Sequence, residues 1–208
     1  MKQFIPKDPG SAITHFIGML MAIFAGIPLL IYKFSAAMVV YLASLILLYA
    51  ASTTYHSFDI SEKVNQILKK ADHMMICVLI AGTYTPICLL SMEKPSGTIL
   101  LIIIWSFALA GILMKAFWVN CPKWVSSILY ICMGWTCLIA LPSIIHALST
   151  ASFLWLLIGG IIYTIGGVIY ALKLSLFNKK HRYFGSHEIF HLFVMGGSFC
   201  HFIVMCLL

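Results

Sequence analysis

The sequence predicts an all-α integral membrane protein, a bundle of seven transmembrane helices. Of its 208 residues, 62% are hydrophobic and only 9% are charged. The mean hydropathy of +1.03 lies far outside the range of soluble globular domains. Seven apolar runs are long enough to cross a hydrocarbon core of about 30 Å, which takes about 20 residues of helix. They use nearly all of the chain, so we expect a single transmembrane domain over residues 1–208.

Each apolar run is uncharged at its centre and ends at a polar or Pro/Gly-containing stretch. We interpret the first run as a helix and not as a signal peptide, because it is too long and no small-residue cleavage site follows it. Only the break between the second and third runs has room for another element, a short surface helix over 61–69. The expected spans are residues 13–32, 38–55, 74–90, 98–114, 125–142, 153–172 and 189–208.

The basic residues predict how the bundle is oriented. Seven spans place the N-terminus and the second, fourth and sixth connections on one side of the membrane. Of the 13 Lys and Arg residues, all fall on that side except Lys33 and Lys94. The positive-inside rule makes the basic side cytoplasmic, so we expect a plasma-membrane protein with its N-terminus inside and its C-terminus outside. This bias, with contact to anionic lipid, accounts for the net charge of +7, and no nucleic-acid partner is expected.

Titratable side chains near the spans are functional candidates, because a membrane penalises them unless they are paired, hydrated or bound to metal. Topology brings three groups of them to one predicted depth on the cytoplasmic side: the end of the second span, the start of the third and the start of the seventh. The candidates are His15, His56, Asp72, His73, His146, His187, Glu188, His191 and His201.

The spacing of these residues predicts a metal site. His187 and His191 are four residues apart, which puts both imidazoles on one helix face about 6 Å apart. With His56 they would make three neutral imidazoles, which together with water form a typical open zinc site. Asp72 could hold that water, take its proton or orient a ligand. Ser52, one turn before His56, could hydrogen-bond the water or a developing oxyanion.

The remaining histidines are interpreted as structural or weaker candidates. His15, His146 and His181 fit hydrogen-bonded or interfacial roles. His201 lies about 21 Å beyond His187 along a helix and cannot share its ion. His73 points about 100° away from Asp72 and is a weaker ligand candidate.

Residues 187–191 also spell H-E-x-x-H, the zinc-metalloprotease signature in which the glutamate is the general base. Membrane-embedded proteases with this motif add a carboxylate ligand from a distant helix, usually an aspartate followed by glycine. This chain has no Asp-Gly dipeptide, and Asp72 precedes His73. An intramembrane protease is therefore the less favoured interpretation, and Glu188 has no assigned role.

A set of motifs spread over almost the whole chain resembles the hemolysin III family, the bacterial branch of the progestin and adipoQ receptor family. That family is related to the adiponectin receptors and more distantly to alkaline ceramidases. The motifs occur in the order found in the family and read SAITHFIG, STTYH (52–56), ADHMMI, GTYTP (82–86) and FGSHEIFH (184–191).

The resemblance implies a seven-helix bundle around a buried zinc ion. Carried over residue by residue, it matches Ser52 and His56 to the S-x-x-x-H motif and Asp72 to the third-helix aspartate. It matches His187 and His191 to the H-x-x-x-H pair. Many members have a glutamate near the first helix where this chain has Asp8 or Gly10, so the resemblance assigns no role to that acid.

The leading functional hypothesis is a zinc-dependent hydrolase acting on a membrane lipid or fatty-acyl substrate, with an amide bond as in ceramidases, or a protein that otherwise supports membrane lipid homeostasis. In this hypothesis Asp72 and Ser52 are catalytic. The alternative is a non-enzymatic sensor or receptor with a structural zinc. A hemolytic pore is less favoured, because the uncharged helix centres provide no polar lining. The sequence predicts no oligomeric state.

Overall fold

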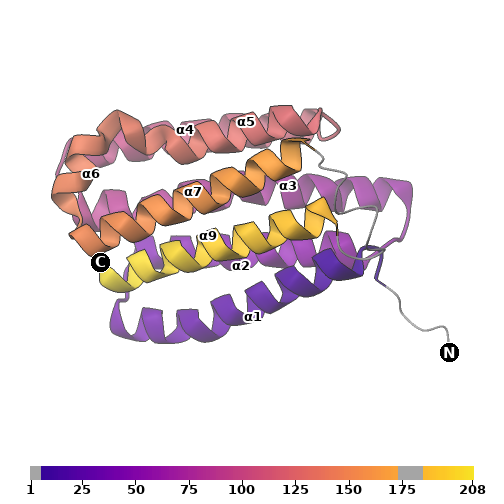
Figure 1. Ribbon diagram of the computed structural model, residues 1–208, viewed down its shortest axis with the longest axis horizontal. Coiled ribbons are helices and arrows are strands. Elements are labelled where there is room, and N and C mark those ends of the chain that lie inside the picture. Colours follow the sequence, from indigo (N-terminus) through magenta and orange to yellow (C-terminus); the bar gives the residue numbers. More distant parts are fainter. Residues whose placement is uncertain (1–5, 173–184) are drawn as a thin grey trace.

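The computed structural model describes residues 6–172 and 185–208, and over these residues it is a helical bundle (Figure 1). Within this described part of the chain, seven helical segments are long and apolar enough to cross a membrane, as predicted. Large apolar side chains cover the outside: Phe24 and Ile31 are each 70% exposed. Such a surface suits lipid and not water. The spans are Pro9–Tyr32, Ala36–Ser57, Glu62–Ser91, Ser96–Phe117, Lys123–Ala147, Thr150–Leu172 and Ser186–Leu207.

The first and last helices are neighbours in the bundle. The last helix, α9, packs against both α7 and α1, and α2 packs against α1 and α3 (Figure 1). These contacts bring the end of α2 and the start of α9 together at one end of the molecule. The bounds are α1 (Pro9–Tyr32), α2 (Ala36–Ser57), α3 (Glu62–Pro86), α4 (Ser96–Phe117), α7 (Thr150–Leu172) and α9 (Ser186–Leu207).

Glycines let α7 and α9 approach each other closely. A Cβ atom on Gly166 would lie 2.6 Å from Cβ of Phe193, and one on Gly197 would lie 2.7 Å from the ring of Tyr163. Both distances are shorter than carbon contacts allow, so a side chain at either position would push the helices apart. This close packing holds the histidine-bearing helix against its neighbour.

The third helix begins well before residue 74, so the separate surface helix predicted over 61–69 was wrong. The hydroxyl of Ser61 caps the N-terminus of α3 by accepting a hydrogen bond from the Val64 N–H at 3.4 Å. No glycine or proline follows until Gly82, so the helix runs on through Asp72 and His73. A π-helical turn, η1 (Ile87–Ser91), continues it.

The fifth span is not one uninterrupted α-helix, and it extends beyond the predicted end at residue 142. Pro142 lacks an N–H and disfavours α-helix just before it. The Tyr84 hydroxyl of α3 donates a hydrogen bond to the Gly134 carbonyl at 2.6 Å and accepts one from the Cys137 N–H at 2.8 Å. These bonds pair backbone groups at the point where the α-helix is interrupted. The segments are α5 (Lys123–Gly134), the 3-10 helix η2 (Trp135–Ala140) and α6 (Leu141–Ala147).

The start of α1 and the end of α9 lie at opposite ends of the bundle, as an odd number of spans requires (Figure 1). The cytoplasmic placement of the N-terminal end stays a prediction. Part of its basis, together with His181, lies outside the described residues: Lys2, Lys173, Lys179, Lys180 and Arg182.

Candidate metal centre

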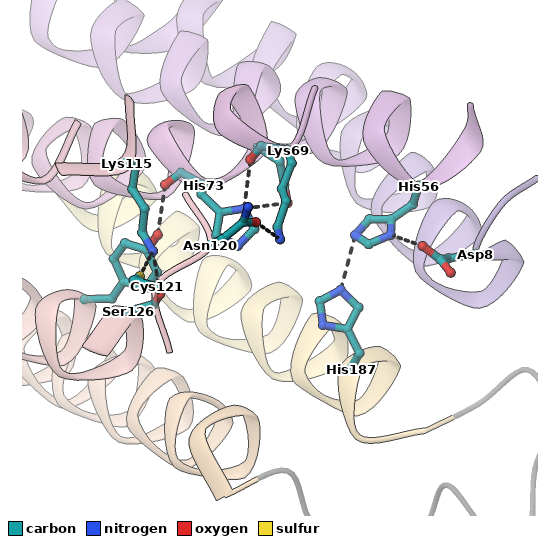
Figure 2. Close-up of polar contacts among 11 residues, drawn as sticks. Asp8, His56, Lys69, His73, Lys115, Asn120, Cys121, Ser126 and His187 are labelled. Atoms are coloured by element: carbon teal, nitrogen blue, oxygen red, sulfur yellow. Dashed lines mark hydrogen bonds and ion pairs between the residues drawn. The ribbon is translucent and has the colours of Figure 1, made fainter. Parts of the chain in front are cut away.

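Three histidines from two helices meet at the N-terminal end of the bundle. His56 is in the last turn of α2, whereas His187 and His191 are in the first two turns of α9. Each offers one ring nitrogen, and these nitrogens all lie within 4.8 Å of one another, so the three side chains could hold a metal ion. His56 and His191 are each only 2% exposed. The structure thus brings together the three predicted ligands, and Figure 2 shows His56 and His187 pointing at each other.

Hydrogen bonds donated to α1 and its N-cap define which nitrogen is free on two of these rings. His56 Nδ1 lies 3.0 Å from Oδ2 of Asp8 (Figure 2). A carboxylate only accepts, so Nδ1 carries the proton and Nε2 is left bare. The Thr14 hydroxyl donates to the Gly10 carbonyl, so its oxygen accepts from His191 Nδ1 at 3.4 Å. Both rings therefore turn Nε2 toward the centre, the usual arrangement of metal-binding histidines.

Asp8 is the acid to which the resemblance assigned no role. The hydrogen bond from His56 holds the pKa of its carboxyl below the usual value, although partial burial raises it. Its backbone N–H also donates to the His56 carbonyl at 2.9 Å. Asp8 therefore fixes both the ring and the backbone of one candidate ligand.

The distance between two facing nitrogens fits a metal ion. His56 Nε2 and His187 Nε2 are 3.2 Å apart. Because His56 Nε2 is bare, His187 Nε2 donates a hydrogen bond to it at this distance, and a bound cation would take the place of that proton. Nitrogens at 2.0–2.1 Å from one tetrahedral zinc ion would be roughly 3.3 Å apart. The arrangement therefore fits zinc, and equally another transition metal that prefers imidazole ligands.

Glu188, the glutamate of H-E-x-x-H, is engaged elsewhere. Its Oε1 accepts from the Ser11 hydroxyl at 2.7 Å, and its Oε2 accepts from the Gly185 N–H at 2.7 Å. The second contact is half of a capping box at the start of α9. With both oxygens bonded, Glu188 ties α9 to α1 and is not free to act as the general base of a protease. A glutamate three residues after an N-cap is the sequence signal for this role.

A cavity of about 410 Å³ lies inside the bundle beside the three histidines. Its wall is mostly apolar, with side chains such as Leu48, Ile76, Leu79, Phe153 and Leu156. Its volume is within the range of small-molecule sites. The polar residues on its wall include all the predicted site residues but His56: Ser52, Asp72, His187 and His191, together with His15, His73, Ser127 and His201.

The two predicted catalytic residues line this cavity but do not belong to the three-histidine group. Ser52 is 1% exposed and Asp72 is 7% exposed. His73, the weaker ligand candidate, has Nδ1 2.9 Å from the Lys69 carbonyl and 3.6 Å from Oδ2 of Asp72. Its shorter contact is therefore with the backbone of its own helix.

The other histidines differ in how they relate to the centre. His15 stacks on His191, with ring centroids 3.7 Å apart and planes 12° apart. No spacing in the sequence links these two residues, so their contact was not foreseen. His201 lies deeper in the cavity wall, where Nε2 is 3.3 Å from the Leu156 carbonyl. His146 is exposed on α6.

Comparison with known proteins agrees with this architecture. The family model described as "Haemolysin-III related" matches residues 4–202. The chain is 38% identical over 205 residues to Hemolysin-3 of Bacillus cereus, covering 95% of this chain and 90% of that protein. It is 38% identical over 201 residues to a Hemolysin-3 homolog of Bacillus subtilis (strain 168), covering 93% and 90%. No solved structure matches significantly. The chain therefore belongs to the haemolysin-III related family.

Proposed function

We propose that this protein is a zinc-dependent hydrolase of membrane lipids that contributes to membrane lipid homeostasis, and that an N-acyl amide is the bond it cleaves. One observation carries the proposal: a group of three imidazoles that could hold a metal ion adjoins, through His187 and His191, a largely apolar cavity that Ser52 and Asp72 also line. The whole chain, 1–208, would act as one transmembrane domain in the plasma membrane with a cytoplasmic N-terminus.

The cavity supports a lipid as substrate. Apolar side chains from α3, α6 and α7, including Ile80, Ile144 and Phe153, line it. An acyl chain would gain roughly 25 cal/mol for each Å² of apolar surface that it buries there. A polar head would then lie at the histidine end. The same apolar wall would keep bulk water from the reacting bond.

Each predicted site residue has a chemical role in this proposal. When bound, zinc supplies a Lewis acid that polarises a carbonyl oxygen and lowers the pKa of water toward about 7. His56, His187 and His191 would hold the zinc ion. Asp72 takes a proton from the attacking water and delivers it to the leaving amine. The buried hydroxyl of Ser52 donates a hydrogen bond to the oxygen that becomes negative.

The alternative is a sensor or receptor in which the metal only ties α2 to α9. It would use the same three histidines. Structural zinc sites have four protein ligands, whereas catalytic sites keep a position open. Among the described residues the candidate group has three members, which favours the hydrolase. The relatives' name refers to hemolysis, but a pore would need a polar lining and the cavity wall is mostly apolar.

The first test is metal content per chain, measured by mass spectrometry on protein in lipid nanodiscs, combined with release of fatty acid from an N-acylated lipid. Wild type should hold about one zinc per chain and release fatty acid. His191→Ala should lose both. Asp72→Ala should keep zinc and hydrolyse 10²–10⁴-fold more slowly, roughly the worth of a general base.

Other outcomes would decide against parts of the proposal. A wild type that holds zinc but cleaves no lipid would support the sensor. A wild type that takes up no zinc when zinc is supplied would exclude both interpretations, because both depend on the metal.

A further inference from the structure

His15 is a buried imidazole with no hydrogen-bond partner on either nitrogen. It lies on α1, is 3% exposed, and neither Nδ1 nor Nε2 is paired within the part of the chain that the structure describes. Leaving a buried polar atom unpaired is unfavourable, because the atom loses its hydrogen bonds to water and gains none in the protein. Native structures rarely carry such a cost without a reason, and one reason is a partner that is not protein. His15 lines the 410 Å³ cavity, so that partner can reach it.

Unpaired buried atoms concentrate on the wall of this one cavity. Over the described residues, the side chains with such atoms are His15, Tyr41, Ser52, Thr53, Ser127, His187 and His201. All of these line the cavity except Tyr41 and Thr53. The cavity therefore offers a set of donors and acceptors to whatever occupies it. His15 contributes more unpaired atoms than any other residue of the set.

The ring of His15 is held in place by its neighbours. One face stacks on His191, 3.7 Å between ring centroids. Tyr49 meets the ring edge-on, with centroids 5.0 Å apart. A side chain fixed in this way loses little freedom when it binds a ligand, so its hydrogen bonds add fully to affinity. Stacking also places His15 beside a candidate metal ligand without making it one, since it is not in the three-histidine group.

We propose that His15 is a ligand-binding residue of the cavity, which hydrogen-bonds the polar end of an acyl lipid while the three-histidine centre holds the metal. This inference rests on the proposed function. A neutral imidazole has one N–H donor and one acceptor nitrogen. It suits a head group that both donates and accepts, and suits a phosphate less well, because a phosphate has only acceptors and leaves one nitrogen unpaired.

The test separates the stacking of the His15 ring from the hydrogen bonds of its nitrogens. His15→Phe keeps a flat ring to stack on His191 but has no nitrogen, whereas His15→Gln keeps one donor and acceptor set without the ring. The probe is lauroyl hydroxamic acid, a metal-binding head on an acyl chain, titrated calorimetrically into zinc-loaded protein in nanodiscs. Its N-methyl analogue lacks the N–H. The control variant is His146→Phe, which changes an exposed histidine on α6.

His15→Phe should hold zinc like wild type and bind the probe about tenfold more weakly, since a hydrogen bond is worth about 1 kcal/mol or somewhat more. His15→Gln should recover part of this loss, and His146→Phe should match wild type. The N-methyl probe should discriminate less between wild type and His15→Phe than the parent probe does.

Three results would overturn the inference. Unchanged probe binding by His15→Phe would show that His15 does not contact the ligand. Loss of zinc from both His15→Phe and His15→Gln would make His15 a support of the metal centre instead. A zinc-loaded wild type that does not bind the probe at all would contradict the proposed function, and this inference with it, whereas the first two results leave the proposed function standing.

Discussion

Two buried polar clusters lie at the same end of the bundle and differ in how their atoms are paired (Figure 2). In the lysine cluster, Lys115 of α4 is 0% exposed. Its ammonium donates to Ser126 Oγ and to Cys121 Sγ at 3.0 Å, and Cys121 and Ser126 are 3.3 Å apart. Every polar atom of that cluster is paired internally. Around the three-histidine centre, by contrast, His15, Ser52 and His187 keep unpaired atoms that belong to a cavity wall.

This difference in hydrogen bonding indicates which cluster supports the fold and which cluster binds a ligand. A cluster whose polar atoms are hydrogen-bonded to one another holds helices together and leaves no donor or acceptor for a ligand. A cluster with unpaired atoms beside a cavity is incomplete until something binds. Substitutions should therefore destabilise the fold at the lysine cluster and weaken binding at the histidine centre. The following tests rank from the largest expected effect to the smallest.

Metal removal should give the largest difference between the two clusters. At free zinc of about 1,000 times Kd, binding stabilises the folded state by about 4 kcal/mol. For a chain of this size that is roughly 10 °C in Tm. Chelation should lower the Tm of wild type and of Lys115→Met by similar amounts. His56→Ala should be insensitive to chelation, and a chelator response equal to that of wild type would contradict the assignment of His56. Thermal unfolding in nanodiscs with and without chelator measures this.

Loss of the carboxylate behind His56 should weaken metal binding by about 10–100-fold, the usual effect of removing a residue that orients a metal ligand. Asp8→Ala makes this change without removing a helix cap, because Asp8 makes no side-chain cap bond. Asp59→Ala is the matched control, because Asp59 is exposed and its carboxylate accepts a hydrogen bond from the Asn65 side chain and not from a candidate metal ligand. Competition with a fluorescent zinc chelator gives both affinities. Equal zinc affinity in Asp8→Ala and Asp59→Ala would remove the role given to Asp8.

Two buried serines should differ in how much the same substitution destabilises the fold. Ser126 and Ser52 are 2% and 1% exposed, but only Ser126 is hydrogen-bonded. Ser126→Ala removes a partner of a buried ammonium and should destabilise by about 1–3 kcal/mol. Ser52→Ala removes an unpaired hydroxyl and should change the free energy of unfolding by less than about 0.5 kcal/mol. Denaturant titration of both variants measures the difference, and equal destabilisation would erase the contrast.

The smallest effect concerns the thiol of the lysine cluster. Burial raises the pKa of Cys121, but hydrogen bonds from Lys115 and Ser126 bring it below the ordinary value. The thiolate therefore persists at lower pH, and the midpoint of Cys121 alkylation should lie below about 8.5. Lys115→Met should raise that midpoint, and exposed Lys63→Met should not. Mass spectrometry of the alkylated peptide across pH resolves Cys121 from the other cysteines, and an unchanged midpoint in Lys115→Met would contradict the pairing.

The fold was largely predictable because the membrane imposes one length scale on every apolar run. The predicted bounds were wrong where a helix cap or a proline acts against the hydropathy of the segment. Ser61 caps α3 in a polar stretch that hydropathy treats as a loop. Pro142 interrupts an apolar run that hydropathy treats as continuous, and the hydroxyl that repairs the break, that of Tyr84, is on another helix.

The candidate centre was predictable only as far as helix geometry reaches. His187 and His191 share a face through their spacing, and His56 joins them through topology. Asp8 meets His56 across 48 residues, and Ser11 meets Glu188 across 177. Those contacts depend on how α1 packs, which no spacing in the sequence encodes. The stacking of His15 on His191 depends on the same packing, so the sequence analysis placed His15 among the structural histidines and not beside the centre.

The packing of the first helix against the last has a consequence for biosynthesis. Membrane chains are made from the N-terminus, so α1 and α2 are in place long before the 22 residues of α9 emerge. His56 then has Asp8 within reach but neither of its histidine neighbours. A chain that stops after α7 keeps six spans and lacks two of the three candidate ligands. Metal binding by the three-histidine centre would therefore require that synthesis and insertion had reached α9.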